Sequence, residues 1–366
     1  MNDLKYKIAL TFLPGIGDIW AKNLVGYCGS AEAVFTETKG KLMKIPGIGS
    51  VNAQAIIVKK EQALERAQEE IEFINKYNIQ ALFFADKNYP ERLKHCADNP
   101  TLLYYKGNSD LNKSKIISIV GTRSATEYGK DFCKTLIKEL SDQNVLIVSG
   151  LAYGIDICAH RSSLENNLET VGVLAHGLDR IYPALHKATA EKMVKQGGLL
   201  TEFPSNTNPD RENFPKRNRI VAGMSDAVIV IETAKKGGAV ITAEIANSYN
   251  RDVFALPGNI DQKYSEGCNF LIKTHKANVI ESAKDIAYVL GWEQAKTKPQ
   301  KQKRIFVDLK KEEKAIIDVL NGNEKVGIDS IAVQSKLPMS QTASILLSLE
   351  MVGMVKAFPG KVYELN

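Results

Sequence analysis

The segment Lys115–Val120, KIISIV, is a short apolar run that leads directly into Gly121, Thr122 and Arg123. Such a run is typical of a buried strand, and the glycine behind it is typical of a tight turn into a helix. The pattern recurs, with further apolar runs at 145–148, 170–174, 199–203, 227–231, 252–256 and 277–280, and with helical stretches between them at 126–141, 154–166, 185–196 and 239–250. Strands that alternate with helices predict a doubly wound parallel sheet covered on both faces, an extended Rossmann-like α/β domain over 81–292.

The segment before this domain contains an internal repeat. Residues 12–17 read FLPGIG and residues 44–49 read KIPGIG, and each is followed by a helix with alanine at the same offset. The repeat resembles the helix-hairpin-helix motif, in which glycines allow a tight turn whose backbone N–H groups can meet a phosphate. The same turn could merely pack two helices. We therefore predict a helical domain of helix-hairpin-helix or SAM-like type over 1–77 and leave its contact with DNA open.

The segment after the sheet begins with a basic linker. Residues 294–304 carry five basic side chains and no acidic one, whereas residues 305–366 carry seven basic and eight acidic. A polar stretch that contains proline is typical of a linker, placed here at 293–304. Three helical patterns followed by two short strands about Pro359 and Gly360 predict a winged-helix domain over 305–366. Its excess of acidic side chains argues against strong duplex binding.

Composition limits the classes of protein that are possible. The chain has 366 residues, 44% hydrophobic and 25% charged, which excludes a disordered chain or a collagen-like fibre. It has no apolar run near the ~20 residues that span a bilayer, and its start lacks the pattern of a signal peptide. Five scattered cysteines without a C-x-x-C pair predict free thiols in a reducing compartment. We expect a cytoplasmic protein without a membrane span.

Glycines gather where the predicted strands end. Gly121 and Thr122 follow the first run, Ser149 and Gly150 the second, and Gly237 and Gly238 the fifth. In an open parallel sheet these turns meet at one edge, where backbone N–H groups and helix N-termini can hold phosphates. Each glycine alone could serve only a tight turn. No G-x-G-x-x-G opens a helix and no Walker A loop is present, so neither a dinucleotide cofactor nor nucleotide hydrolysis is predicted.

Cations stand near these turns. Arg123, at the start of a predicted helix, suits a backbone phosphate or a guanine edge, although a salt bridge would also explain it. A second cluster places four cations around an aromatic ring, a pattern typical of single-strand binding. Phe214 could instead be a core anchor, with some cations capping a helix. The cluster comprises Arg211, Phe214, Lys216, Arg217, Asn218 and Arg219.

Residues for acid–base catalysis are few. Asp156, His160, His176, Asp179 and His186 lie near predicted strand ends or helix starts, but a lone histidine there is more often a structural hydrogen-bonding group. No Ser/His/Asp spacing and no cluster of metal ligands is present in the sequence. We therefore predict no catalytic residue, no metal and no cofactor.

The motifs of the sheet domain resemble the DNA-processing protein A (DprA/Smf) family, in family order. The residues that carry the resemblance are 88–90, 99–107, 120–129, 149–160, 173–186, 214–225, 232–258 and 267–269. The resemblance implies a protein that binds single-stranded DNA, protects it, and loads the recombinase RecA onto it during natural transformation. It also implies a homodimer joined through the Rossmann-like domain. By position, the strand-end turns, Arg123 and the cluster around Phe214 look like the strand-binding groove of the family.

Two other functions compete with this one. The wider superfamily includes phosphoribohydrolases that cleave nucleoside monophosphates with a P-G-G-x-G-T-x-x-E loop. Residues 236–244 keep Gly237, Gly238 and Glu244 but lack the proline, the third glycine and the threonine in register. We therefore expect no enzyme. A regulator that binds duplex DNA through the winged helix is disfavoured by the acidity of that segment.

Overall fold

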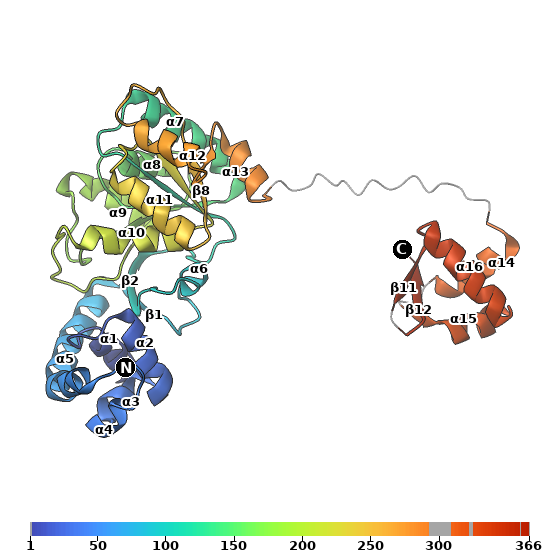
Figure 1. Ribbon diagram of the computed structural model, residues 1–366, viewed down its shortest axis with the longest axis horizontal. Helices are drawn as coiled ribbons and strands as arrows, with labels where there is room; N and C mark the ends of the chain where they lie inside the picture. The colour runs from blue at the N-terminus through green and yellow to red at the C-terminus, as the bar shows by residue number, and fades with distance from the viewer. Residues whose placement is uncertain (1, 293–308, 322–324, 359, 366) are drawn as a thin grey trace. The chain divides into compact units, whose positions relative to one another are not determined.

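The computed structural model describes residues 2–292, 309–321, 325–358 and 360–365. It divides into two compact units, within residues 1–293 and 294–366. The basic linker predicted at 293–304 lies outside the described residues. The larger unit contains both the helical segment and the sheet, and each unit is described by itself (Figure 1).

A nine-stranded sheet forms the centre of the larger unit, in the order β1-β2-β6-β5-β4-β3-β7-β8-β9. β3 lies between β4 and β7, so the strand order reverses at β3. From β6 to β9 all neighbours are parallel, whereas β1 and β2 are antiparallel to their neighbours. The strands are β1 Gln80–Phe83, β2 Leu102–Gly107, β3 Ile116–Gly121, β4 Leu146–Ser149, β5 Thr170–Val173, β6 Gly197–Thr201, β7 Ala227–Ile231, β8 Asp252–Ala255 and β9 Asn278–Val279. The predicted α/β fold with a mostly parallel sheet is confirmed.

β3 is apolar at successive positions because both faces of the sheet are covered, and its one polar side chain, Ser118, donates to the carbonyl of Val221 at 2.6 Å. Ile117 and Ile119 point to one face, where they join the core made by α7, α8 and α13. Ile116 and Val120 point to the other, where they join the core made by α10, α11 and α12. Side chains alternate along a strand, so burial of both faces requires apolar residues at successive positions.

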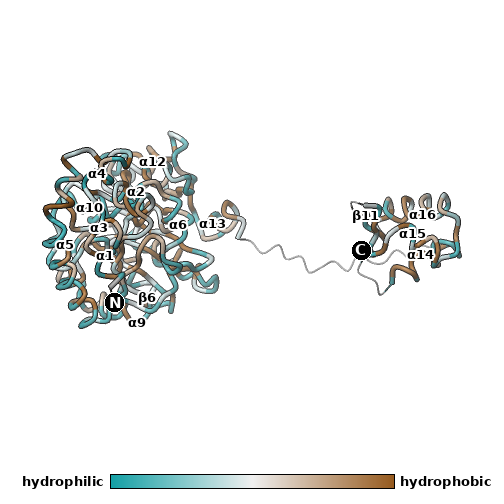
Figure 2. The backbone as a smooth tube through the Cα atoms, turned by 90° about the horizontal axis from the view of Figure 1, so that it is seen from below, coloured by the Kyte–Doolittle hydropathy of each residue, from teal (hydrophilic) through white to brown (hydrophobic). Residues whose placement is uncertain are grey.

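Four of the covering helices, α7, α8, α9 and α11, follow predicted stretches closely, whereas α10, α12 and α13 were not predicted. Figure 1 shows the helices on the two faces of the sheet. Hydrophilic segments run along outer helices such as α5 and α9 (Figure 2). Besides short α6 (Glu91–Lys94), the helices of the sheet domain are α7 Glu127–Leu140, α8 Ile155–Glu165, α9 Lys187–Lys195, α10 Asn213–Gly223, α11 Gly238–Ser248, α12 Glu266–Lys273 and α13 Ala283–Val289.

The antiparallel strands β1 and β2 were not predicted from the sequence. β2 pairs with β6 through Tyr104 opposite Thr201 and Tyr105 opposite Leu200. Partners almost a hundred residues apart set this register, and no turn motif joins the two strands. The local pattern therefore could not reveal the extension of the sheet.

The helical segment is built on the predicted repeat. Its helices are α1 Asn2–Leu10, α2 Asp18–Cys28, α3 Ala31–Thr36, α4 Lys39–Leu42 and α5 Ser50–Tyr77. Gly15 and Gly47 occupy equivalent turns with φ of +74° and +84°, a region that favours glycine. Gly17 and Gly49 are the N-caps of α2 and α5. The two sequence copies are therefore two copies of one helix-entering turn.

Hydrogen bonds of a partly buried ion pair on α5 connect the helical segment to the sheet domain. The carboxylate of Glu70 on α5 is 1% exposed and pairs with Arg66 at 2.8 Å. It also accepts a hydrogen bond from the backbone N–H of Ser205, beyond β6, at 2.9 Å. Arg66 Nη2 in turn donates to the carbonyl of Ser205 at 3.0 Å. Both charged groups are thus paired and hydrogen-bonded, as buried charges require.

The smaller unit is a winged helix, as predicted. Its helices pack around a core of Ile316, Ile331, Leu346 and Val355, and its sheet has the order β10-β12-β11. The elements are α14 Lys311–Leu320, β10 Val326–Gly327, α15 Ile328–Ser335, α16 Met339–Met351, β11 Val355–Phe358 and β12 Val362–Leu365.

Candidate nucleic-acid interface

The turns after β3 and β4 pack so closely that they require glycine. A Cβ on Gly121 would lie 2.1 Å from the carbonyl oxygen of Ile231. Gly154, with φ of +76°, lies against the turn after β3, and a Cβ there would be 2.1 Å from the carbonyl oxygen of Thr122. The start of α8 is thereby held against the end of β3. The predicted gathering of strand ends at one edge of the sheet is present.

Arg123 projects from the turn after β3. Its side chain is exposed, and its guanidinium carbon lies 5.4 Å from the centroid of the Phe214 ring on α10. Tyr182 places a second ring 6.4 Å from that of Phe214. A cation held over an aromatic face is attracted by the ring quadrupole. The arrangement offers a charge and flat apolar surfaces at one place.

These side chains line a hollow at the carboxyl ends of β4 and β5, next to the point where the strand order reverses. Two tyrosines of this hollow were missed by the sequence analysis. Tyr153 is 41% exposed and Tyr182 is 46% exposed. Tyr153 lies in the segment 149–160 and Tyr182 in the segment 173–186, both of which follow predicted strands. An aromatic residue in such a segment was the sequence feature that could have identified them as part of the site. The hollow is lined by Arg123, Gly150, Ala152, Tyr153, Leu174, Ala175, His176, Tyr182, Pro183, Phe214 and Arg217.

Arg217 has an intramolecular role. It is 6% exposed, and its Nη1 donates to the carbonyl oxygens of Gly150 and, at 2.8 Å, of Val173. It therefore joins the ends of β4 and β5 to α10. Burial raises the pKa of the nearby Asp156 carboxyl, and the charge of Arg217 opposes that rise. Asn218 accepts a hydrogen bond from Arg217 Nε at 3.1 Å. Within the protein, the guanidinium of Arg217 is hydrogen-bonded to the carbonyl oxygens of Gly150 and Val173 and to the side chain of Asn218. Contact of Arg217 with DNA stays a prediction.

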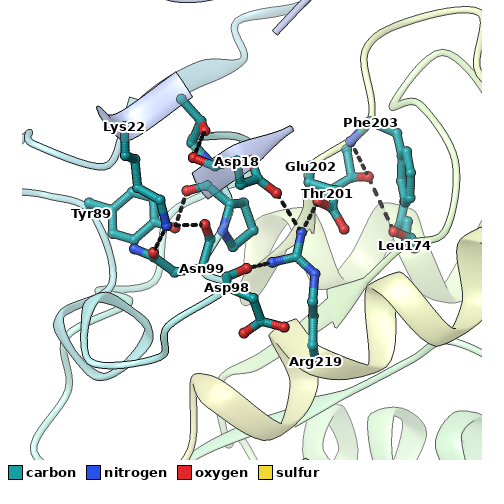
Figure 3. A network of polar contacts seen from close by, with 12 residues as sticks. Asp18, Lys22, Tyr89, Asp98, Asn99, Leu174, Thr201, Glu202, Phe203 and Arg219 are labelled. Carbon is teal, nitrogen blue, oxygen red and sulfur yellow. Dashed lines mark hydrogen bonds and ion pairs between the residues drawn. The ribbon is translucent and has the colours of Figure 1, made fainter. Parts of the chain in front are cut away.

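Arg219 points to the other side of α10, into a network shown in Figure 3. Its guanidinium pairs with Asp18 of α2 at 3.0 Å and with Glu202, which follows β6. It also donates to the carbonyl oxygen of Asp98. The structure thus uses Arg219 to join the helical segment to the sheet domain, and its predicted contact with DNA is untested.

The remaining predicted residues divide between surface and interior. Arg211 and Lys216 are exposed, and neither they nor Arg123 form an ion pair within the described ranges. Ser149 is buried, and its hydroxyl donates to the carbonyl of Ile119 at 2.6 Å. Gly237 and Gly238 begin α11 beyond β7 and do not line the hollow. Of the predicted cations, Arg123, Arg211 and Lys216 are therefore the ones available to a ligand.

The histidines near the strand ends are engaged with the backbone. His176 Nδ1 donates to the carbonyl of Gly177 at 2.8 Å, and its Nε2 accepts from the N–H of Tyr182 at 3.2 Å. His186 Nδ1 donates to the carbonyl of Leu151 at 2.8 Å. Both ring nitrogens of His176 are thus occupied, so it offers no free base to a ligand.

Neither a cluster of metal ligands nor a membrane-spanning helix occurs among the described residues. No group of three or more His, Cys, Asp or Glu side chains within those ranges could hold a metal ion. No described helix is both long and apolar enough to cross a bilayer.

A mostly parallel sheet with glycine turns, and with a cation-bearing hollow beside its topological switch point, defines a Rossmann-like α/β protein. The chain belongs to the DNA recombination-mediator protein A family, the DprA/Smf proteins. The model of that family matches residues 80–291, and the DprA winged helix domain matches residues 300–361.

Relatives cover most or all of the chain. Protein Smf of Synechocystis sp. is 32% identical over 99% of each chain. The X-ray structure of DNA processing protein A from Streptococcus pneumoniae is 32% identical, with a TM-score of 0.69, over 78% of this chain and 97% of that one. A structure of DNA processing protein A from Helicobacter pylori, described for its single-stranded DNA binding mode, is 29% identical, with a TM-score of 0.54, over 59% and 97%.

Proposed function

We propose that the chain binds single-stranded DNA in the hollow at the carboxyl ends of β3, β4 and β5. One observation carries the proposal: Arg123, exposed and without an ion-pair partner in the described ranges, stands over Phe214 beside exposed tyrosines. Single-strand binding combines cations that follow the backbone with rings on which bases stack. The relative from Helicobacter pylori, described as binding single-stranded DNA, supports this function.

The test compares single- and double-stranded oligonucleotides of the same sequence by fluorescence anisotropy. We expect the single strand to bind more tightly, because stacking on Phe214 and the tyrosines requires unpaired bases. Equal or tighter binding of the duplex would contradict the proposal and would favour a role for the winged helix.

We further propose that the bound strand is protected and passed to RecA in natural transformation, by a homodimer in the cytoplasm. Exposed apolar side chains of the sheet domain, among them Ile241 and Ile260, support self-association there. Light scattering tests the dimer. RecA loading is tested by the rate of RecA nucleation on a single strand, with the Arg123→Ala variant as control. No stimulation of RecA would overturn this part.

We also propose that the chain binds without catalysis. His176 has both ring nitrogens engaged, and Glu244, the acid kept from the phosphoribohydrolase loop, is exposed and pairs with Lys276 at 2.9 Å. Incubation with AMP tests the enzyme directly. Release of ribose 5-phosphate that scales with the protein concentration would overturn the proposal.

A further inference from the structure

A second cleft lies between the helical segment and the sheet domain, within the larger unit. It has a volume of about 580 Å³, within the ~300–1,000 Å³ usual for small-ligand sites. Ile16 to Ala21 of the first helix-hairpin-helix turn form one wall, and residues 202–204 after β6 form another. The proposed strand-binding hollow uses none of the residues that line this cleft.

The floor of the cleft has an excess of negative charge. Arg219 is its central cation and pairs with two carboxylates, Asp18 and Glu202 (Figure 3). Asp18 has both oxygens occupied, because Oδ1 accepts from the N–H of Thr101 at 2.7 Å and Oδ2 from Arg219. Such a floor favours a ligand that presents hydrogen-bond donors rather than an anion.

Glu202 leaves one acceptor unused. Its Oε2 accepts from Arg219, whereas its Oε1 is buried and has no partner among the described residues. The side chain is 11% exposed, and burial raises the pKa of Glu202 to about 7. Buried carboxylate oxygens are normally hydrogen-bonded, so an unused acceptor in the lining of a cleft points to a donor supplied from outside.

The walls of the cleft include flat apolar surfaces. Trp20 and Phe203 both line it, and Ile19 beside them is 53% exposed. The Trp20 ring is held by the second copy of the repeat, since a Cβ on Gly47 would lie 1.7 Å from two ring carbons. Rings held in this way provide surfaces on which a planar group can stack.

Helix α10 connects this cleft with the strand-binding hollow. Phe214 and Arg217 line the hollow, whereas Lys216 and Arg219 line the cleft. Residues three apart share a helix face, so α10 forms a ridge with one site on each side. Lys216 is exposed and can meet a phosphate where a strand crosses the ridge.

We propose that the cleft binds one unstacked base of the bound single strand and prefers guanine. Guanine carries two adjacent donors, N1–H and N2–H, on its Watson–Crick edge. Oε1 of Glu202 can accept from one of them, and the second lone pair of Oε2, which also accepts from Arg219, can accept from the other. Adenine and cytosine place a ring acceptor beside their amino group, and thymine has a single N–H. The inference rests on the single-strand binding proposed above.

The experiment compares all-thymine 20-mers with 20-mers that carry one central guanine, adenine or cytosine. We expect the guanine strand to bind about fivefold or more tightly than the others, as for a paired donor–acceptor contact. In the Glu202→Gln variant the ratio of guanine to thymine affinity falls to about one, because the carboxylate charge is lost. A wild-type ratio of one, or an unchanged ratio in the variant, overturns the inference.

Fluorescence reports on the cleft without altering Glu202. The chain has two tryptophans, Trp20 and Trp292, so the Trp292→Phe variant leaves Trp20 as the single reporter. The guanine strand should change Trp20 emission in this variant, and Glu202→Gln in the same background should abolish that change. Binding of all strands without a guanine effect overturns this inference alone. Binding of no strand overturns the proposed function as well.

Discussion

The guanidinium carbon of Arg123 lies 5.4 Å from the centroid of the Phe214 ring, although the two residues are 91 positions apart in the sequence. β3 ends in the turn that carries Arg123, and Phe214 lies in the first turn of α10, so the fold brings a cation and a ring together at the strand ends. This contact orients the guanidinium while leaving it exposed to a ligand. The predictions below separate residues that would contact DNA from residues that hold the site together.

Loss of Arg123 should weaken single-strand binding selectively. We expect Arg123→Ala to lower affinity about tenfold, the loss of one charge-assisted contact, and to reduce the slope of log affinity against log salt by about 0.7. Anisotropy titrations at several salt concentrations measure both. Arg161→Ala, on the exposed surface of α8, is the matched control. Equal effects of the two substitutions would refute a specific contact by Arg123.

Loss of Arg217 should destabilise the fold. The guanidinium is buried and joins the carbonyls of Gly150 and Val173, and its removal leaves the buried Asp156 without its nearby positive charge. We expect Arg217→Ala to lower the free energy of unfolding by about 3 kcal/mol, as when one partner of a buried pair is removed. Denaturant titration measures this. An unchanged midpoint would show that Arg217 does not support the strand ends.

Two glycines at strand-end turns should respond differently to alanine. A Cβ on Gly150 would lie 2.0 Å from Arg217 Nη1, so Gly150→Ala must displace that buried guanidinium. Nothing lies within 4 Å of a Cβ on Gly238, at the start of α11. We expect a loss of about 1–3 kcal/mol for Gly150→Ala and a change within about 0.5 kcal/mol for Gly238→Ala. Thermal unfolding of both variants checks the contrast, and similar melting temperatures would contradict it.

His160 should make the protein sensitive to acid. Its Nδ1 lies 2.7 Å from Thr170 Oγ1, whose hydroxyl donates to the carbonyl of Ile147, so Nδ1 is the donor. Nε2 is buried without a partner within the described residues, and burial lowers the pKa of His160 to about 3.

The direction of the pH dependence of stability follows from the protonation of His160 in the folded and in the unfolded chain. The unfolded chain protonates this histidine below its ordinary pKa of 6.5 while the folded protein keeps it neutral, so stability falls as the pH drops from about 6.5 toward 3. The slope from this group is up to about 1.4 kcal/mol per pH unit. His160→Asn keeps a donor for Thr170 and does not titrate. The variant should therefore lose less stability between pH 7 and pH 5 than the wild type, and parallel curves would refute the assignment.

Much of the parallel sheet could be predicted because each strand and helix is encoded locally. The run 116–120 is apolar except for Ser118 because both faces of β3 are covered, and the two PGIG copies show their glycine turns directly. β1 and β2 could not be predicted in this way, since their place in the sheet depends on pairing with β6, far along the chain.

The candidate site could be predicted only in part, because the sequence gives the position of a residue along a strand or helix but not the direction of its side chain. Sequence order places Arg123 and the glycines at strand ends, but it does not show which way a helical side chain points. On α10 the four positions from Lys216 to Arg219 include two cations that turn into the protein, Arg217 toward Gly150 and Arg219 toward Asp18. Their direction depends on the packing of α10 between two parts of the larger unit.

The strand at the far end of the sheet has a consequence for how copies of the chain can meet. β9 has only two residues, Asn278 and Val279, and no strand among the described residues pairs with its outer side. An edge this short offers too few free backbone groups to template a neighbouring chain. Contact between two copies at this edge therefore has to rely on side chains rather than on a continuous intermolecular sheet, so single side-chain substitutions there would change its strength.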